Sequence, residues 1–218
     1  MEEKYYNSRD MHLKASGKIS VFKRFRNVIK NGMFLFGLKN RLARIGIEIM
    51  PYYWVQEEVE DCVEPQIKGA DSEFTLRELN FDEVKFISKE IDNLQIDLLE
   101  KEYQECPLCL GLEHENEIAA YMFIGFNDVT FKDKLFPIKN NEAYLTSMWT
   151  FHAFRGRNLA PYLRYKSYQF LKENGRDTKY SISEYFNKST IKFKSKLNSK
   201  HLRLYIISIV SRADSVIH

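Results

Sequence analysis

The stretch at residues 143–171 constrains the chain most, because an apolar run stands directly before a short basic turn and a second apolar-periodic run. Residues 143–151 have the composition of a strand. The run that ends at Leu171 has helical spacing and is followed by the helix-stop pair Asn174 and Gly175. We therefore expect a strand, a turn at residues 155–160 and a helix, in that order.

The turn at residues 155–160 suits a bound anion. The first amides of a helix have no partner within the helix and carry partial positive charge, which a diphosphate satisfies. Gly156 has no side chain, Asn158 tolerates left-handed backbone, and Ala160 is small. Arg155 and Arg157 can reach phosphate oxygens. The pattern predicts a phosphate site, and the alternative is an ordinary helix cap.

The rest of the chain alternates between strand and helix patterns, which predicts an α+β fold. Apolar runs separated by a polar stretch at residues 113–117 indicate a hairpin. An extended segment or an edge strand is expected at 45–59, and strands at 74–79, 107–112, 118–126, 143–151, 179–184 and 202–210. Helices are expected at 81–90, 92–105 and 189–197, and from the 155–160 turn through Leu171.

Length and charge fit one main domain. The chain has 218 residues, 44% of them hydrophobic, which is enough for one substantial core. The formal net charge of +3 hides blocks of +7, −14 and +10 over residues 1–50, 51–120 and 121–218. The basic last block would attract a polyanionic cofactor, or the charged blocks simply solvate the fold.

The three cysteines predict a reducing, cytoplasmic environment. Cys62, Cys106 and Cys109 are odd in number, and no secretory leader precedes them in this sequence. Cys106 and Cys109 form a CxxC pair, but no second pair stands at zinc-binding spacing. We expect core cysteines and no metal, with a metal or redox site as the alternative.

The N-terminal region is basic and amphipathic. Apolar residues recur at near-helical spacing over residues 19–44 among lysines and arginines. Such a segment packs on the protein's own core or docks peripherally on an anionic membrane. We expect residues 1–60 to form an extension packed on a main domain of residues 61–218.

Three motifs in sequence order resemble the GNAT superfamily of acyl-CoA N-acyltransferases. The residues Arg155, Gly156, Arg157, Asn158, Leu159 and Ala160 resemble its phosphate-binding turn, with Asn158 in place of the middle glycine. Downstream, residues 187–197 resemble its Asn-led helix, and upstream residues 74–82 are similar to its first strand and turn. The resemblance covers residues 73–200.

The resemblance implies a mixed, mainly antiparallel central sheet flanked by helices, with acetyl-CoA or another acyl-CoA as cosubstrate. The turn would bind the cofactor phosphates, and the backbones of Trp149, Thr150 and Phe151, together with Asn187, would contact the pantetheine arm. The thioester would lie where two neighbouring strands splay apart. An amine would attack it directly, without a covalent enzyme intermediate.

The catalytic groups of the family are not all recognisable. The family's usual proton-donating tyrosine aligns with Lys194, and the strand at 143–151 contains no glutamate to act as base. Tyr185, Ser189 and Tyr144 are the nearest hydroxyl candidates, and a water molecule could replace a base. The family's last strand is either missing or replaced by the segment at 45–59.

The resemblance predicts an enzyme that transfers an acyl group to an amine-bearing acceptor. The alternative is a non-catalytic module of the same fold that binds CoA or a protein partner. Nucleic-acid binding is not expected, because the acidic middle block opposes a uniform basic face. Acids near the acceptor site would favour a cationic amine, and a homodimer is compatible with the sequence.

Overall fold

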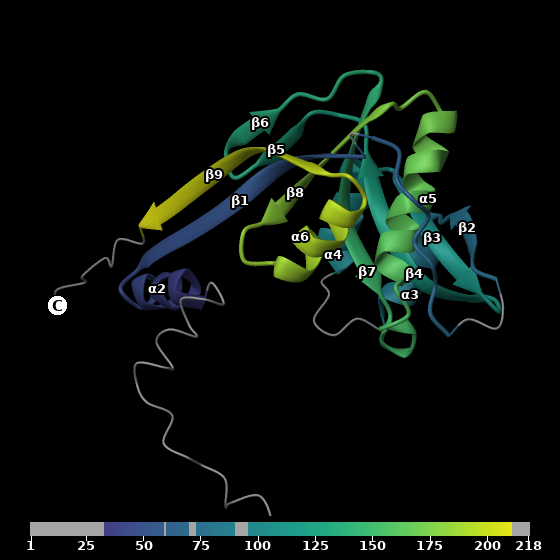
Figure 1. Cartoon of the computed structure of the whole chain (residues 1–218), viewed down its shortest axis with the longest axis horizontal. Coiled ribbons are helices and arrows are strands. Elements are labelled where there is room, and N and C mark those ends of the chain that lie inside the picture. The colour runs from purple at the N-terminus through teal and green to yellow at the C-terminus, as the bar shows by residue number, and fades with distance from the viewer. Residues whose placement is uncertain (1–32, 59, 70–72, 90–95, 211–218) are drawn as a thin grey trace, which may run out of the picture. The chain divides into compact units, whose positions relative to one another are not determined.

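The computed structural model describes residues 33–58, 60–69, 73–89 and 96–210 (Figure 1). The chain divides into two compact units, the larger of which runs from Met50 to Ile207. The smaller unit includes helix α2 (Met33–Arg44) and the first residues of strand β1 (Ile47–Glu57). The division predicted after residue 60 stays a prediction.

Seven strands of the described residues form one sheet, in the order β2-β3-β4-β7-β8-β1-β9. Strands β7 and β8 pair in parallel, whereas the pairs β2–β3, β3–β4, β4–β7 and β8–β1 are antiparallel. The predicted mixed, mainly antiparallel sheet is therefore confirmed. Besides β1, the strands are β2 (Thr75–Glu78), β3 (Leu108–His114), β4 (Glu117–Gly125), β7 (Glu142–Thr150), β8 (Thr178–Glu184) and β9 (Lys200–Val210).

Strand β1 occupies the position beside β8, on the side away from β7. Its register runs from Tyr52 opposite Glu184 to Glu57 opposite Lys179. The segment predicted at 45–59 thus forms an internal strand of the sheet rather than an edge strand, because β9 forms the edge next to it. Because strand side chains alternate between faces, Val55 and Glu57 share one face and Trp54 points to the other.

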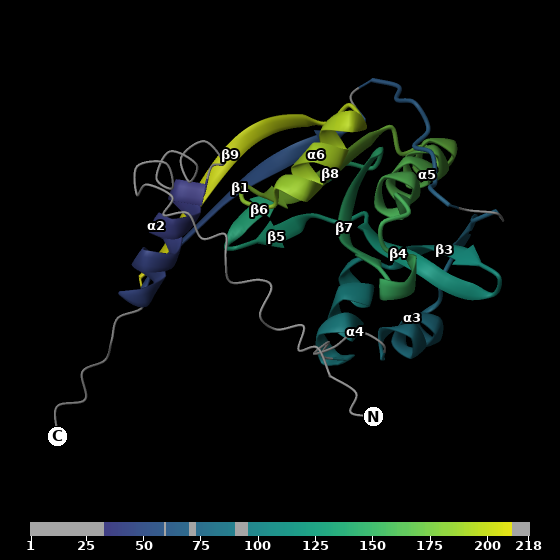
Figure 2. The same cartoon turned by 60° about the horizontal axis from the view of Figure 1, so that its bottom comes forward.

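Helices cover both faces of the sheet (Figure 2). The ring of Phe123 lies 6.2 Å from Tyr103 of helix α4 (Ile96–Glu105), whereas its neighbour Met122 contacts Arg164 of helix α5 (Leu159–Glu173). Adjacent residues of a strand face opposite sides, so α4 and α5 lie on opposite faces. Helix α3 (Phe81–Ser88) contacts α4, and helix α6 (Lys188–Lys196) shares the face of α5.

One pair of strands was not predicted. Strands β5 (Val129–Phe131) and β6 (Lys134–Phe136) form a separate antiparallel ribbon. The ring of Phe136 stacks on Trp54 with centroids 4.3 Å apart, so the ribbon covers aromatic residues of the sheet. The strands are three residues each, too short for a clear two-residue period in the sequence.

No helix of the described residues is both long and apolar enough to cross a membrane. Residues 19–32 of the predicted amphipathic segment lie outside the described residues, and its remaining part forms α2, with Arg41 and Arg44 in the last turn. The part of the predicted helix 92–105 before Ile96 also lies outside them. The other predicted strands and helices are confirmed, with ends shifted by up to two residues.

Candidate functional site

The 155–160 turn joins β7 to α5 through a short 3₁₀ helix, η1 (His152–Phe154). Gly156 has φ 83°, and Asn158, directly before the first helical residue, has φ 68° and ψ 24°. Both residues therefore have left-handed backbone, which glycine and asparagine adopt at least cost. Leu159 is buried beneath the turn, so it anchors the first turn of α5 to the core.

Five consecutive amides of this turn are available. The amide of Arg155 donates to the carbonyl of His152 at 3.2 Å. Those of residues 156–160 donate to no protein group in the part of the chain that the structure describes. A Cβ atom added to Gly156 would meet no heavy atom within 4 Å, so the turn faces open space there. These amides are free to bind an anion that approaches from this side.

Two arginines flank the turn. Arg155 donates from Nε to the carbonyl of Thr150 at 3.1 Å, and its guanidinium lies 5.1 Å from the ring centroid of Trp149. The guanidinium of Arg157 lies 5.5 Å from the ring centroid of Phe154. Both cations are thus held beside the available amides, which adds positive potential where the helix begins.

A neighbouring segment fixes the shape of the turn. Asn158 donates from Nδ2 to the carbonyl of Gln66 at 2.8 Å, and the amide of Lys68 donates to the carbonyl of Arg157 at 2.9 Å. These bonds engage a side chain and a carbonyl, and they leave the five amides untouched. The left-handed Asn158 is therefore stabilised by a specific partner.

Strands β7 and β8 separate beyond their first residues. Their register runs only from Glu142–Thr178 to Tyr144–Tyr180, although β7 continues to Thr150 and β8 to Glu184. The expected splay between two neighbouring strands is thus present. It leaves one edge of β7 unpaired along the residues that lead to the turn.

Strand β7 carries a bulge within this unpaired stretch. The β4–β7 register passes from Tyr121–Trp149 to Phe123–Thr146, so Ser147 and Met148 together oppose the single residue Met122. Ser147 has φ 34° and its side chain is exposed. A bulge bends a strand and breaks its ladder, and bulges are frequent beside active sites.

The three strand residues predicted to contact pantetheine differ in how many of their backbone groups are already hydrogen-bonded. Phe151 has both backbone groups engaged, since its amide donates to Ala119 and its carbonyl accepts from Phe154, each at 3.0 Å. Trp149 and Thr150 lie on the strand beside the splay, although the carbonyl of Thr150 accepts from Arg155. Among the predicted strand residues, these two are therefore better placed than Phe151 for backbone pairing.

The remaining predicted residues lie in different settings. Asn187 caps α6, because its Oδ1 accepts from the amide of Thr190 at 3.1 Å. Tyr144 is buried, and burial raises the pKa of its hydroxyl to about 12. Tyr185 lies beyond β8, with its ring centroid 5.7 Å from that of Tyr53, and Ser189 is exposed in the first turn of α6. The three hydroxyl candidates come from separate elements.

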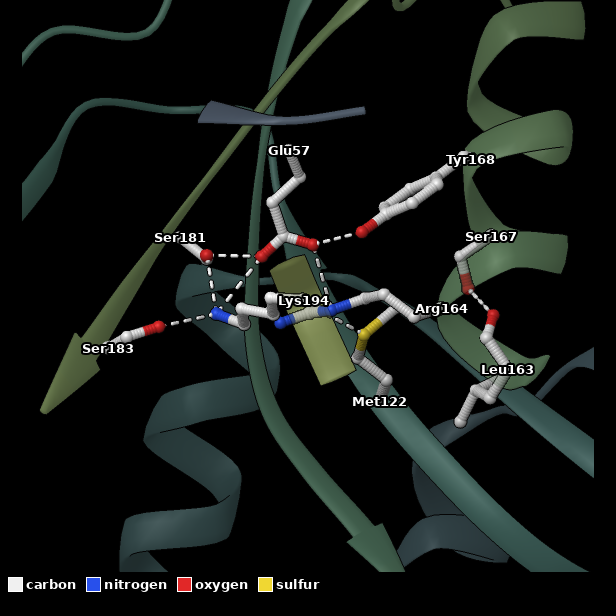
Figure 3. Close-up of polar contacts among 9 residues, drawn as sticks. All are labelled: Glu57, Met122, Leu163, Arg164, Ser167, Tyr168, Ser181, Ser183 and Lys194. Atoms are coloured by element: carbon white, nitrogen blue, oxygen red, sulfur yellow. Dashed lines mark hydrogen bonds and ion pairs between the residues drawn. The ribbon is translucent and has the colours of Figure 1, made fainter. Parts of the chain in front are cut away.

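A buried polar group of six residues lies beneath α5 and α6, and we call it the Glu57 cluster (Figure 3). The Oε1 atom of Glu57 is 3.0 Å from Lys194 Nζ, and Oε2 is 3.0 Å from Arg164 Nε. The cluster joins β1, α5, β8 and α6, and it consists of Glu57, Arg164, Tyr168, Ser181, Ser183 and Lys194.

Every donor of Lys194 has an acceptor in the Glu57 cluster. Besides Glu57, its Nζ donates to Ser181 Oγ at 2.6 Å and to Ser183 Oγ at 2.9 Å. Ser181 directly follows Tyr180, the last β8 residue that pairs with β7, so the cluster begins where these two strands separate. The residue aligned with the family's tyrosine is therefore a buried, fully bonded ammonium.

The Glu57 cluster contains one carboxylate and two cations, so it carries one excess positive charge. Burial alone would raise the pKa of Glu57, but Arg164 and Lys194 outweigh it and lower the pKa to about 2. Burial lowers the pKa of Lys194 to about 8, although Glu57 opposes the change. Removal of the single carboxylate would leave two buried cations without their counter-ion.

The CxxC cysteines belong to the core. Cys106 and Cys109 are buried, and burial raises the pKa of each thiol to about 12. Thiols with such pKa values are almost fully protonated near neutral pH and are poor nucleophiles and metal ligands.

The sequence analysis missed two acidic residues that the fold brings into the interior. Glu57 lies two residues after the buried Val55 on β1, so the two side chains share one face of the sheet. Glu102 lies three residues after the buried Leu99 on α4, so these two share one face of the helix. In each case an acid at an apolar-face position is the available signal. Glu102 is half-buried, and burial raises the pKa of its carboxyl group.

No protein-family model matches the sequence, and no curated protein matches it. The fold is similar to solved structures of acetyltransferases. An acetyltransferase of the GNAT family from Colwellia psychrerythraea has a TM-score of 0.54 and 13% identity, over 75% of this chain and 56% of that one. A GCN5-related N-acetyltransferase from Sphaerobacter thermophilus has a TM-score of 0.52 and 9% identity, over 87% and 67%.

A third structure extends this likeness. A GCN5-related N-acetyltransferase from Kribbella flavida has a TM-score of 0.51 and 13% identity, over 83% of this chain and 65% of that one. These identities are low, so the likeness is one of fold. With the splayed parallel strands, the bulge and the helix that follows the turn, the chain has the fold of the GNAT acetyltransferases.

Proposed function

We propose that the protein transfers an acyl group from acyl-CoA to an amine. The observation that carries this proposal is the row of five available amides at residues 156–160, at the start of a helix and beside Arg155 and Arg157. A diphosphate has the charge and the acceptor oxygens that such a site requires. The fold, shared with acetyltransferases, supports the same assignment.

The unpaired edge of β7 leads from the turn to the bulge, and we propose that the pantetheine arm follows it. Its amide groups would pair with the backbone of Trp149 and Thr150, as an added strand does. The thioester would then lie near Ser147, where β7 and β8 have separated. Asn187 would contact the arm from the N-cap position of α6.

The chemistry is one displacement. The amine nitrogen forms a bond to the thioester carbon, the carbon–sulfur bond breaks, and the electron pair leaves with the thiolate. The amine loses a proton, and the thiolate takes one from solvent or from a nearby group. The hydroxyl candidates for that proton remain Tyr185, Ser189 and Tyr144, and acetyl-CoA is the first donor to test.

Thermal unfolding with CoA tests the binding step. A ligand at 100 times its dissociation constant stabilises the native state by about 2.7 kcal/mol, so the melting temperature should rise clearly. Arg155→Ala should weaken CoA binding about tenfold or more, because charge-assisted hydrogen bonds contribute about 1.5–3 kcal/mol. Lys172→Ala is the control, since Lys172 is an exposed cation toward the other end of α5.

Release of free thiol from acetyl-CoA, measured with a panel of primary amines, tests the reaction step. Amine-dependent release supports an enzyme. CoA binding without release by any amine would favour a non-catalytic module, and the bonded Lys194 in place of a tyrosine gives that outcome a structural basis. The cytoplasmic location, a homodimer and peripheral membrane contact of residues 19–44 stay predictions.

A further inference from the structure

A pocket lies at the C-terminal end of helix α5, the end that is remote from the 155–160 turn. Its volume of about 390 Å³ is within the range of roughly 300–1,000 Å³ that small-molecule sites occupy. Residues of β2, of the beginning of β3, of the chain after β4 and of the end of α5 line it. None of these residues belongs to β7 or to the turn, so the pocket is separate from the proposed acyl-CoA site.

Most of the pocket wall is apolar. Five apolar residues contribute to it, namely Pro107, Leu108, Phe126, Phe170 and Leu171. Leu108, Phe126 and Phe170 are only half-buried, so their side chains keep accessible surface. Contact with an apolar group of a ligand would remove that surface from water, which is favourable. The pocket therefore fits a ligand with an apolar part.

Arg176 adds a positive charge to this wall. Its guanidinium carbon lies 4.4 Å from the ring centroid of Phe126, and its Nη1 donates to the carbonyl of Glu142 at 2.9 Å. These two contacts hold the guanidinium in place and use one of its five N–H donors. Arg176 is half-buried, and no carboxylate of the described residues lies within ion-pair distance of it. Its other donors therefore suit the carboxylate of a ligand, which a guanidinium binds in a bidentate geometry.

Glu78 adds a negative charge to the same pocket. Its backbone carbonyl accepts from Arg77 at 3.3 Å, but its carboxylate forms no ion pair within the described part of the chain. Asn174 donates from Nδ2 to the carbonyl of Phe170 at 2.8 Å, which leaves its Oδ1 as a further acceptor. Glu78 and Arg176 thus line one pocket without pairing with each other. Such separated charges are complementary to a ligand that carries both an ammonium and a carboxylate group.

We propose that this pocket binds a free α-amino acid with an apolar side chain. The carboxylate of the amino acid pairs with Arg176, and its ammonium group pairs with Glu78 and the side-chain oxygen of Asn174. Its side chain packs against Phe126 and Phe170. An amine without a carboxylate leaves Arg176 unpaired, and a carboxylic acid without an amine adds a second negative charge to the pocket, so the site selects a zwitterion.

A purely structural role of Arg176 is the competing explanation. Its bond to the carbonyl of Glu142 ties the loop after α5 to the start of β7, and its contact with Phe126 ties that loop to the end of β4. That role accounts for one donor, and it gives no reason for an unpaired Glu78 at the same pocket. A structural Arg176 would change only stability when it is substituted, whereas a ligand-binding Arg176 also changes the affinity for amino acids.

Calorimetric titration with L-phenylalanine at pH 7 tests the proposal, and phenylpropionate and phenethylamine are the matched ligands that each lack one charge. Phenylalanine should show saturable binding, and each matched ligand should bind about tenfold or more weakly, because each loses a charge-assisted pair. Arg176→Gln and Glu78→Gln should each weaken phenylalanine binding by about tenfold or more for the same reason. Arg203→Gln is the control, because this guanidinium also lies over a ring, 6.0 Å from the centroid of Tyr205, but on a strand that does not line the pocket.

The titrations also define what would overturn the inference. Equal affinity for phenylalanine and either matched ligand would contradict a zwitterion site, as would the absence of phenylalanine binding. Unchanged affinity in both Arg176→Gln and Glu78→Gln would overturn the assignment to this pocket. Glu78 is exposed at the end of β2, so its variant keeps the test decisive if Arg176→Gln lowers stability. The titration contains no CoA, so failure of CoA to bind would contradict the proposed function and leave this inference standing.

Discussion

The 155–160 turn and the Glu57 cluster differ in whether their charged and polar groups have hydrogen-bond partners. In the turn, five amides have no partner among the residues that the structure describes, and both arginines lie beside an open site. In the Glu57 cluster, the carboxylate and the ammonium are bonded on all sides, and the side chain of Glu57 is 0% exposed. Unsatisfied, accessible groups are available to a ligand, whereas satisfied, buried groups stabilise the fold.

The comparison assigns Lys194 to the structural group of residues. Lys194 stands where the family that the sequence resembles usually has a proton-donating tyrosine, and its three donors already have Glu57, Ser181 and Ser183 as acceptors. A proton on Lys194 would have to leave this enclosed group before it reached a substrate. We therefore place Lys194 with the residues that hold α6 to the sheet.

The largest expected effect is on stability. Glu57→Gln leaves Arg164 and Lys194 as buried cations without a counter-ion, and loss of one partner of a buried pair costs about 3–5 kcal/mol. Denaturant unfolding at pH 7 measures the change. The control is Glu64→Gln, because Glu64 pairs with Lys166 at 2.9 Å on the surface, where a pair contributes about 1 kcal/mol or less. Equal losses in the two variants would remove the contrast between buried and exposed charge.

Lowering the pH should reduce the contribution of Glu57 to the stability of the folded protein. The folded pKa of Glu57 is about 2, below its ordinary value of 4.5, so its contribution to stability is complete above pH 4.5 and disappears as the pH falls toward 2. The stability gap between wild type and Glu57→Gln should therefore narrow over that interval. A gap that stays constant between pH 5 and pH 2.5 would mean that Glu57 is not ionised in the folded protein at pH 5.

A smaller effect on stability is expected from substitutions of Asn158 in the 155–160 turn. Asn158→Ala should be about 1–2 kcal/mol less stable than Asn158→Gly, because only alanine bears the cost of the left-handed region. Both variants lose the hydrogen bond to Gln66, so the difference isolates backbone conformation. Denaturant unfolding of the two proteins measures it, and equal stabilities would show that residue 158 leaves this conformation when its side chain is changed.

Much of the sheet could be predicted from the sequence, because its strands and helices carry clear periodicity between polar and apolar residues. The 155–160 turn was also predictable, since it depends on adjacent residues and local backbone geometry. The ion pairs of Glu57 were not predictable, because its partners Arg164 and Lys194 are far away in the sequence and meet it only in the folded protein. The Glu57 cluster is therefore a property of tertiary pairing rather than of a local motif.

The central claim is that the amides of residues 156–160 bind a diphosphate. Calorimetric titration of the wild-type protein with CoA and, separately, with pantetheine tests it directly, because pantetheine lacks the diphosphate and the nucleotide. We predict measurable binding of CoA that weakens at high salt, and pantetheine binding at least 100-fold weaker. Equal affinity for the two compounds, or no binding of CoA at all, would contradict the account.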